Sequence, residues 1–387
     1  MFKLQTLNKI SSTGLDVFEK EKYEIANETT NPDAILVRSA NMLDMELQSN
    51  LKAIARAGAG VNNIPIDRCT EKGIVVFNTP GANANAVKEL VIASLLLSSR
   101  KISKGIEWAQ TLKGNGSEVE KMVEKGKSQF EGPEIKGKRL GVIGLGAIGV
   151  MVANDALSLG MDVIGYDPYI SIKAAWELSS SVHRATSLEQ LISTSDYLTI
   201  HVPYMDSTKN MLNKDMFNIM KKGVRVLNFA RGGLVSNKDI IEAIENGTVE
   251  CYVTDFPSDE LLGFDKVIAI PHLGASTPES EENCAMMAAV QMREFLEKGH
   301  IKNSVNFPDS ELARTGDTRV IVAHDNVPNM FGQITSTIAS YKINIGDMLS
   351  RHRDKIGYTI FDVEGSMPEE VVNKIKTISG IRMVRII

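Results

Sequence analysis

The feature that most constrains the fold is a glycine-rich turn between a β-branched run and a helical pattern. Gly144-Leu-Gly146-Ala-Ile-Gly149 follows the run Leu140–Ile143, and the helical pattern continues to Leu159. In this context Gly144 makes a tight turn, Gly146 lets the backbone approach a pyrophosphate, and Gly149 allows the helix to pack closely on the strand. The unpaired N–H groups at the start of the helix favour an anion. The sequence therefore predicts a dinucleotide-binding β-α-β unit.

An acidic residue in the right place supports this interpretation. Asp167 directly follows the next predicted strand, Val163–Tyr166. A carboxylate there accepts hydrogen bonds from ribose hydroxyls and repels a 2′-phosphate. We therefore expect NAD rather than NADP as the cofactor. The alternative is a turn that binds no anion and an aspartate that is simply exposed.

The rest of the chain has the pattern of an α/β protein, because short β-branched runs alternate with helical segments. The first series of strands covers 34–38, 51–56 and 74–77 and ends in an apolar helix over 85–100. The second series predicts six parallel strands: 140–143, 163–166, 197–201, 224–228, 251–254 and 266–270. We expect a Rossmann-type doubly wound parallel sheet for the second series and a flavodoxin-like sheet for the first. Residues 108–138, rich in Lys, Glu and Gly, are expected to form an exposed connection.

These series define three expected domains. Residues 1–98 and 285–308 form the first, and residues 99–284 form the dinucleotide-binding domain. After a linker at Asn306–Pro308, residues 317–387 have the pattern strand, helix, strand, strand, helix, strand. That order predicts a small α+β domain at the C-terminal end.

Composition excludes several classes of function. A formal net charge of −5 argues against a nucleic-acid binder or a basic membrane-surface protein. The longest apolar stretch, Val91–Leu97, is far shorter than the roughly 20 residues that span a bilayer, and no signal-peptide pattern precedes it. Cys69, Cys251 and Cys284 lack C-x-x-C spacing, so we expect three buried small side chains and no disulfide or metal site. We therefore expect a cytoplasmic protein.

Arg231 is the first candidate for substrate binding. It follows the strand over 224–228 and precedes Gly232-Gly233, so its guanidinium projects from a tight turn at a strand end. Ligands bind at this edge of doubly wound sheets, and a planar guanidinium suits bidentate capture of a carboxylate. An arginine at this place also fits an ordinary surface ion pair.

His272 is the candidate acid/base. It follows the strand over 266–270, and an imidazole that titrates near neutrality suits the removal or return of the proton of a secondary alcohol. A neighbouring acid would orient the ring, and the upstream Asp259 and Glu260 are the candidates. A lone histidine in a loop also fits an ordinary polar role.

At these residues the sequence resembles the D-2-hydroxyacid dehydrogenases, over almost the whole chain. Besides the glycine-rich turn with Asp167, the motifs are Arg56-Ala-Gly-Ala-Gly-Val-Asn-Asn63, His201-Val-Pro203, Asn228-Phe-Ala-Arg231-Gly-Gly233 and Pro271-His272. The resemblance implies NAD-dependent oxidation of the CH–OH group of a D-2-hydroxy acid. It is strongest to the members that oxidise D-3-phosphoglycerate in L-serine biosynthesis, which implies a phosphorylated substrate.

The resemblance also implies a role for each matched residue. Arg231 would bind the substrate carboxylate and carbonyl, and His272 would be the acid/base. Arg38 and Arg56 match the arginines that hold the phosphate, and the backbone amides of Gly58, Ala59, Gly60 and Val61 resemble a second carboxylate anchor. The residues implied to bind the cofactor are Gly144, Gly146, Ala147, Ile148, Gly149, Asp167, His201, Val202, Pro203, Thr208, Ala230, Asp255, His272 and Gly274.

One position departs from the family pattern. The family normally pairs the histidine with a glutamate, whereas this sequence aligns Asp259 there, with Glu260 next to it. An aspartate side chain is shorter by one C–C bond, roughly 1.5 Å. Either Asp259 serves after a small backbone adjustment, or Glu260 replaces it, or the pair is weakened. We expect Asp259 to be the partner.

The C-terminal segment resembles an ACT domain, a small module that binds amino acids, often across a dimer. His324, Asn326 and Asn344 match positions that contact serine in serine-inhibited relatives, which implies L-serine as an effector and a homodimer or homotetramer. Where many ACT domains have Pro-Gly, this chain has Pro328-Asn329, and asparagine tolerates positive φ better than most residues. A dimerisation module without a ligand is the alternative.

Two other functions remain open at this point. A hydroxypyruvate or glyoxylate reductase would keep the chemistry but would leave Arg38 and Arg56 without an obvious anion. An NAD-sensing binding protein would keep the fold and lose the catalysis, which only the departure at Asp259 favours.

Overall fold

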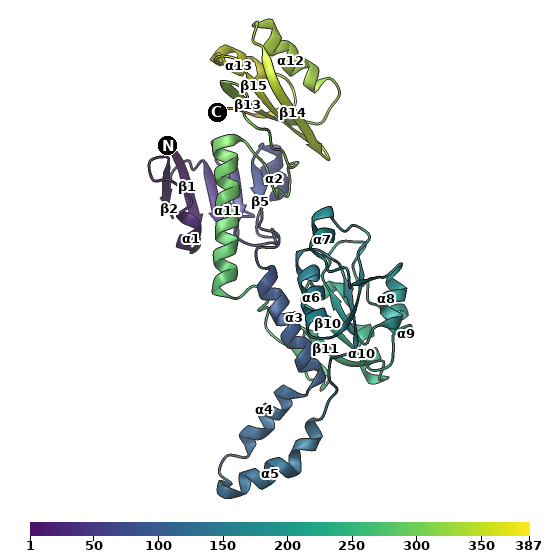
Figure 1. Cartoon of the computed structure of the whole chain (residues 1–387). Helices are drawn as coiled ribbons and strands as arrows, with labels where there is room; N and C mark the ends of the chain where they lie inside the picture. The colour runs from purple at the N-terminus through teal and green to yellow at the C-terminus, as the bar shows by residue number, and fades with distance from the viewer. The chain divides into compact units, whose positions relative to one another are not determined.

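A computed structural model describes residues 1–387. The chain forms two compact units, one of Met1–Asn83 with Pro278–Ile387 and the other of Ala84–Thr277 (Figure 1). Each unit contains its own sheets and apolar cores. The finer division into three domains with boundaries at 98 and 284 stays a prediction.

The first unit begins with a five-stranded parallel sheet of order β2-β1-β3-β4-β5. Its strands are β1 (Phe2–Leu7), β2 (Tyr23–Ala26), β3 (Ala34–Val37), β4 (Ala53–Arg56) and β5 (Val75–Phe77). The helices are α1 (Ser12–Leu15), α2 (Ile66–Glu71) and the long α11 (Pro278–Lys298), which returns to this unit from the end of the second. The strand order is that of flavodoxin-like sheets, in which ligands bind beyond the carboxyl ends of the strands.

The C-terminal part of the same unit is a four-stranded antiparallel sheet of order β14-β15-β13-β16. Its elements are β13 (Thr318–Asp325), α12 (Met330–Ser340), β14 (Ile345–Arg353), β15 (Ile356–Val363), α13 (Glu369–Lys376) and β16 (Ile381–Ile386). The predicted element order is confirmed. Side chains of α12 and α13, such as Ile334 and Val371, pack on one face of this sheet.

The opposite face of the C-terminal sheet packs against the first sheet and α11. Ile321, Tyr358 and Ile360 belong to the same apolar core as Phe77 and Phe295. Polar contacts tie the end of α11 to this face. The hydroxyl of Tyr358 donates to Gly299 O at 2.7 Å, Arg385 donates to Leu296 O at 2.8 Å, and Arg319 donates to Lys298 O at 3.0 Å. Because helix C-termini expose unpaired carbonyls, these side chains act as a cap.

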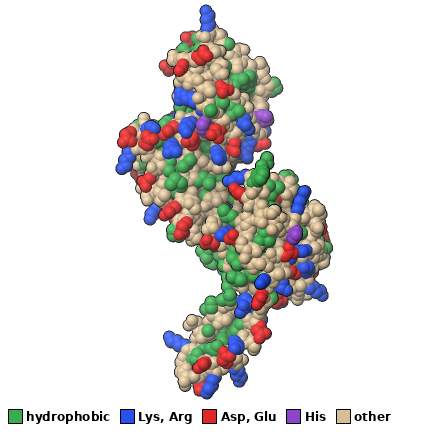
Figure 2. Space-filling model, in the orientation of Figure 1, with side chains coloured by type: hydrophobic (Ala, Val, Ile, Leu, Met, Phe, Trp, Pro, Cys, Tyr) green, Lys and Arg blue, Asp and Glu red, His purple; other side chains and the backbone are tan.

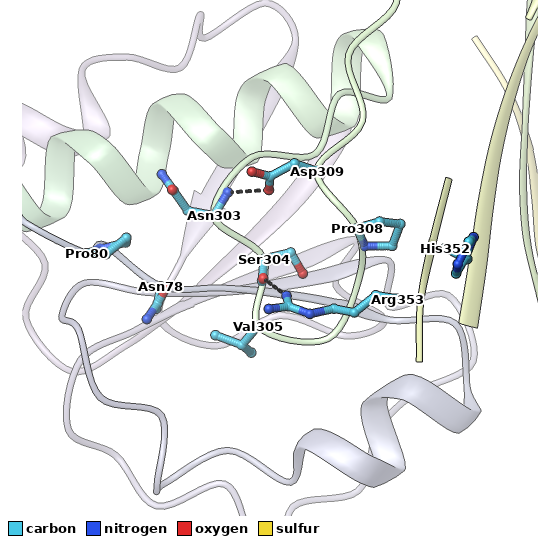
Figure 3. Close-up of a pocket in the computed structure, with 9 residues that line it drawn as sticks. All are labelled: Asn78, Pro80, Asn303, Ser304, Val305, Pro308, Asp309, His352 and Arg353. Atoms are coloured by element: carbon cyan, nitrogen blue, oxygen red, sulfur yellow. Dashed lines mark hydrogen bonds between the residues drawn. The ribbon is translucent and has the colours of Figure 1, made fainter. Parts of the chain in front are cut away.

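A cavity of about 550 Å³ lies where the linker 303–309 meets β14 (Figure 3). Arg353, at the end of β14, reaches the backbone oxygen of Ser304, and Asp309 accepts the N–H of Asn303 at 2.9 Å. On another wall, the Asn78 side chain donates to Ala59 O at 2.6 Å. The N–H of Asn78 donates to Asn303 O at 3.4 Å, so the linker contacts both the C-terminal sheet and the residue that binds the loop 58–61.

The second unit is a seven-stranded parallel sheet of order β12-β11-β10-β9-β6-β7-β8, which confirms the Rossmann-type fold. Its strands are β6 (Arg139–Ile143), β7 (Asp162–Tyr166), β8 (His183–Arg184), β9 (Tyr197–Ile200), β10 (Val224–Asn228), β11 (Val249–Thr254) and β12 (Val267–Ala269). Helices α8 (Leu188–Thr194), α9 (Lys214–Asn218) and α10 (Asn237–Glu245) contribute to one core. Helices α3 (Ala84–Ser99) and α6 (Ala147–Ser158) contribute to the other. The short α7 (Ile172–Glu177) follows β7.

A helical arm continues from the end of α3 (Figure 1). It contains α4 (Ile102–Thr111), η1 (Gly116–Glu118), α5 (Val119–Gly126) and η2 (Lys127–Phe130), and none of these elements has a buried residue. Figure 2 shows charged side chains of both signs over this arm. The expected exposure of residues 108–138 is confirmed, although most of this segment is helical. The rings of Trp108 and Phe130, 5.3 Å apart, hold the arm together.

Two further expectations concern cysteines and membranes. Cys69, Cys251 and Cys284 are buried and unpaired, as the sequence predicts. Burial raises the pKa of Cys69 to about 12 and that of Cys251 to about 11, so both remain thiols near neutral pH. None of the helices combines the length and the apolar character that a membrane span would need.

Candidate active site

The glycine-rich turn has the geometry of an anion-binding loop. Gly144 follows β6 with φ of +90°, a conformation that L side chains rarely adopt. A Cβ at Gly149 would lie 2.0 Å from Gly144 O, whereas a Cβ at Gly146 would meet nothing within 4 Å. No side chain caps α6, which begins at Ala147. The turn therefore presents helix N–H groups beside open space.

Asp167 lies beside this turn, at the end of β7. One carboxylate oxygen accepts the N–H of Leu145 and the other accepts the N–H of Tyr169, both at 2.8 Å. These bonds fix the carboxylate next to the turn. Each oxygen keeps a further lone pair for a ribose hydroxyl.

Arg231 follows β10 in a turn that a buried asparagine holds. Asn228 has no exposed surface, and its side-chain amide donates to Arg231 O at 2.9 Å while its side-chain oxygen accepts the N–H of Ala230 at 3.2 Å. A Cβ at Gly232 would lie 3.2 Å from Phe256 Cβ, and one at Gly233 would lie 2.5 Å from the ring of Tyr204. The glycines thus let neighbouring loops close around the turn, and the Arg231 side chain itself is exposed.

His272 and Asp255 leave the carboxyl ends of adjacent strands. Thr254 of β11 pairs with Ala269 of β12, so Asp255 and His272 follow at the same sheet edge. The rings of His272 and Phe256 are tilted against each other with centroids 4.8 Å apart. The imidazole is exposed, as expected for an acid/base that must reach a substrate.

Asp255 is the buried carboxylate of this edge. Its exposed fraction is 1%, and neither oxygen has a hydrogen bond of normal geometry. Burial raises the pKa of the Asp255 carboxyl, while the nearby His272, the Gly274 amide and Arg231 act against that rise. The charges that Asp255 meets are therefore those of the two residues predicted to bind and deprotonate the substrate.

Asp259 and Glu260 are the two acids expected to pair with His272. Glu260 accepts a hydrogen bond from the Asn237 side chain at 3.0 Å, and Asp259 is exposed to solvent. Neither forms a hydrogen bond with the His272 ring. The pairing of Asp259 with His272 is thus not seen as a hydrogen bond in the structure, and it stays a prediction.

The segment after β9 contains further residues expected to bind the cofactor. His201 Nε2 and the Thr199 hydroxyl are 2.9 Å apart, whereas Nδ1 is buried without a partner. Burial lowers the pKa of His201 to about 3, so this ring is neutral at physiological pH. The Thr208 hydroxyl donates to Pro203 O at 2.7 Å and fixes the loop that follows. A Cβ at Gly144 would lie 2.8 Å from Val202, so this segment adjoins the glycine-rich turn.

The two predicted phosphate-binding arginines lie in the first unit, at the ends of the adjacent strands β3 and β4. The Arg38 guanidinium forms an ion pair with Glu281 of α11 at 2.6 Å. Arg56 donates through Nε to Arg38 O at 2.9 Å and through Nη1 to Gly60 O. The structure therefore brings Arg38, Arg56 and the loop 58–61 together.

The loop 58–61 has backbone amides available for a ligand. The carbonyl of Gly58 accepts the N–H of Thr79 at 3.1 Å, and the carbonyl of Ala59 accepts the Asn78 side chain. No hydrogen bond within the chain uses the N–H groups of Ala59, Gly60 or Val61. This arrangement suits a carboxylate anchor, since adjacent backbone amides can bind an anion.

Comparison with known proteins places this geometry in a family. Residues 92–274 match the domain described as D-isomer specific 2-hydroxyacid dehydrogenase, NAD binding domain. Over 401 aligned residues the chain is 30% identical to the D-3-phosphoglycerate dehydrogenase of Haemophilus influenzae, covering 99% of this chain and 94% of that protein. The chain belongs to the D-isomer specific 2-hydroxyacid dehydrogenase family.

Other relatives of the chain are longer. The chain is 33% identical to the D-3-phosphoglycerate dehydrogenase of Methanocaldococcus jannaschii, covering 84% of this chain and 60% of that protein. It spans 58% of the corresponding protein of Archaeoglobus fulgidus, at 35% identity over 79% of this chain.

Solved structures show the same fold. An apo D-mandelate dehydrogenase of Rhodotorula graminis is 25% identical, with a TM-score of 0.67 over 81% of this chain and 99% of that one. An NAD⁺-bound 3-phosphoglycerate dehydrogenase of Entamoeba histolytica is also 25% identical, with a TM-score of 0.61 over 79% of this chain and 98% of that one.

The cofactor is NAD, and the residues present fit it. The matched segment is the NAD-binding domain of the family. The open space at Gly146 and the uncapped start of α6 suit a pyrophosphate. The fixed carboxylate of Asp167 suits a ribose with free hydroxyls.

The C-terminal residues expected to contact an effector differ in accessibility. His324 is buried, and its Nδ1 and Nε2 lie 2.9 Å from Asp325 O and the Thr359 hydroxyl respectively. It therefore has no ring nitrogen available to an effector in this structure. Asn326 and Asn344 are exposed. Asn329 has φ of 63°, so the predicted tolerance of a left-handed asparagine at this turn is confirmed.

Proposed function

We propose that the protein is a D-3-phosphoglycerate dehydrogenase that oxidises D-3-phosphoglycerate to 3-phosphohydroxypyruvate with NAD, the reaction that opens L-serine biosynthesis. The observation that carries this proposal is the pair of arginines, Arg38 and Arg56, at adjacent strand ends beside the free amides of residues 59–61, whereas the N–H of Gly58 donates to Arg56 O. The names of the relatives from H. influenzae and M. jannaschii support the same substrate.

Each group of the site has a chemical role in this reaction. Arg231 binds the substrate carboxylate, and its positive charge stabilises the carbonyl oxygen that develops at C2. His272 takes the proton of the C2 hydroxyl. Arg38 and Arg56 bind the phosphate. When bound, NAD supplies the hydride acceptor. Because the side chains are held on strand ends, much of the rate comes from positioning.

A second candidate is a hydroxypyruvate or glyoxylate reductase. One observation favours it, namely the ion pair between Arg38 and Glu281, which neutralises a cation that a phosphate would need. Such exposed pairs are worth at most about 1 kcal/mol, so a dianionic phosphate competes with Glu281 readily. The ion pair between Arg38 and Glu281 is therefore compatible with D-3-phosphoglycerate, which stays the substrate that we propose.

The test is NADH formation by the full chain with D-3-phosphoglycerate, D-glycerate or D-lactate. We expect kcat/KM for D-3-phosphoglycerate to exceed the other two by at least about 100-fold, the effect of two charge-assisted contacts. A preference for an unphosphorylated acid would support the reductase. No turnover with any of them would reject both candidates.

The C-terminal α+β domain is proposed to be an ACT domain that responds to L-serine. Its strand order and the exposed Asn326 and Asn344 support this assignment, whereas the internal bonds of His324 leave that residue with a packing role. We expect a cytoplasmic homo-oligomer. Calorimetric titration of the full chain with L-serine tests the effector, and no heat of binding at millimolar serine rejects it.

A further inference from the structure

We infer that Asp255 is the positioning carboxylate of His272, in the place that the sequence comparison gives to Asp259. The inference rests on the proposed dehydrogenase function, in which His272 is the acid/base. It assigns to Asp255 a role that differs from the cofactor contact expected from the sequence.

The burial of Asp255 is the first observation. Its carboxylate is 1% exposed, and neither oxygen has a hydrogen bond of normal geometry within the chain. A buried charge without partners is costly, and native structures retain one only where something else compensates it. An imidazole that becomes protonated during turnover is such a compensating group.

The placement of Asp255 is the second observation. It directly follows β11, whose last residue, Thr254, accepts the N–H of Ile270 at 3.0 Å just before His272. A Cβ at Gly274 would lie 3.4 Å from Asp255 Oδ2, so the carboxylate faces the segment that carries the histidine. Phe256 is the next residue along the chain, and its ring packs against the imidazole of His272 with the two centroids 4.8 Å apart.

The competing acids are the third observation. Glu260 accepts a hydrogen bond from Asn237, and Asp259 is exposed. The charged groups that act on Asp255 are His272 and Arg231, which lower the pKa of its carboxyl. Burial has the larger effect and raises that pKa. Asp255 is thus the only carboxylate of this sheet edge that is shielded from water and adjoins the catalytic histidine segment, where its charge is least screened.

Asp255 acts through the histidine and not on the substrate. A negative charge beside the ring stabilises the imidazolium that forms when His272 takes the hydroxyl proton. It also selects one orientation of the ring, as a carboxylate does in other acid/base pairs.

The test is an NMR titration of the His272 ring in the full chain without substrate. The chain has six histidines, so the resonance can be assigned by its loss in His272→Gln. The variants are Asp255→Asn, which is close to isosteric, and the two competing candidates, Asp259→Asn and Glu260→Gln. The NAD dissociation constant is measured for each.

We expect Asp255→Asn to lower the pH midpoint of the His272 titration by about one unit, because an opposite charge is lost. The midpoint should stay in place in Asp259→Asn and Glu260→Gln, and NAD affinity should change by less than about threefold in these two variants. An unmoved midpoint in Asp255→Asn, or a large loss of NAD affinity alone, overturns the inference.

If Asp255→Asn does not fold, the variants at the exposed residues Asp259 and Glu260 still test the inference. A fall of the midpoint in Asp259→Asn or Glu260→Gln would by itself assign the role to that residue and overturn the inference. If neither moves the midpoint, Asp255→Ser, which is smaller and removes the same charge, replaces Asp255→Asn. The titration requires no turnover, so inactivity toward D-3-phosphoglycerate would reject the proposed function without affecting this result.

Discussion

The side-chain amide of Asn228 donates a hydrogen bond to the backbone oxygen of Arg231 at 2.9 Å. This bond links a fully buried side chain at the end of β10 to the turn that presents the guanidinium. The position of Arg231 therefore depends on a residue that need not touch the substrate.

Asn228→Ala should lower kcat/KM by about 10- to 100-fold, because a small misplacement of a binding group is enough to do so. It should also lower the free energy of unfolding by about 1–3 kcal/mol, since polar groups of the turn lose their partner. Steady-state kinetics and urea unfolding measure both effects. Asn246→Ala, at an exposed asparagine of the same unit, is the control. Full activity in Asn228→Ala would show that the turn keeps Arg231 in position without the Asn228 side chain.

The second and third glycines of the glycine-rich turn, Gly146 and Gly149, should respond differently to alanine. In Gly149→Ala the new methyl group would lie 2.0 Å from Gly144 O, so we expect a loss of about 1–3 kcal/mol of stability from overpacking. In Gly146→Ala the methyl group enters open space, so stability should hold while NAD affinity falls by at least about tenfold. Thermal unfolding and calorimetric NAD titration distinguish the two. Equal effects of both changes on NAD affinity at unchanged stability would contradict this account of the turn.

Arg38→Gln and Glu281→Gln should change KM for D-3-phosphoglycerate in opposite directions. Arg38→Gln should raise KM for D-3-phosphoglycerate by about 10-fold or more, because a charge-assisted contact is lost, with little effect on D-glycerate. Glu281→Gln should lower KM for D-3-phosphoglycerate severalfold, because it frees Arg38 from its ion pair.

Lys302→Gln removes an exposed cation from the same unit and is the control for net charge. If Arg38→Gln raised KM for D-glycerate and D-3-phosphoglycerate equally, Arg38 would not read the phosphate.

His201 should make stability depend on pH. Its folded pKa of about 3 lies below the ordinary value of 6.5, so the unfolded chain binds the proton more readily. The stability linked to this group is complete above pH 6.5 and is lost as the pH falls toward 3. Between pH 7 and pH 5 the loss should be about 1–2 kcal/mol.

Urea unfolding at the two pH values measures this loss, and His201→Gln should show a smaller decrease than the parent chain. Identical decreases would place the acid sensitivity elsewhere.

The strands that the sequence predicts correctly are mostly apolar and buried along most of their length. Residues 34–37 and 224–228 are buried on both sides of their sheets, so their composition alone indicates strands. The sequence does not predict the edge strands β2 and β8, because each is short and partly or wholly exposed. β1 alternates apolar and polar residues, a period-2 signal that could have been recognised.

The partner of His272 shows where sequence patterns stop being informative. The resemblance to the family indicates Asp259, whereas the surroundings of the neighbouring Glu260 depend on a side chain from another element, Asn237 of α10, which donates to it. Asp255 is buried because strand ends pack around it, and the spacing of residues in the sequence does not predict such burial.

The most direct test of the central claim follows the hydrogen at C2. The full chain is incubated with NAD and D-3-phosphoglycerate deuterated at C2, and the reduced cofactor is examined by NMR. We expect deuterium in the reduced nicotinamide of the parent chain, and transfer slowed by at least about 100-fold in both Arg231→Gln and His272→Gln. Absence of deuterium transfer in the parent chain, or undiminished transfer in both variants, would contradict it.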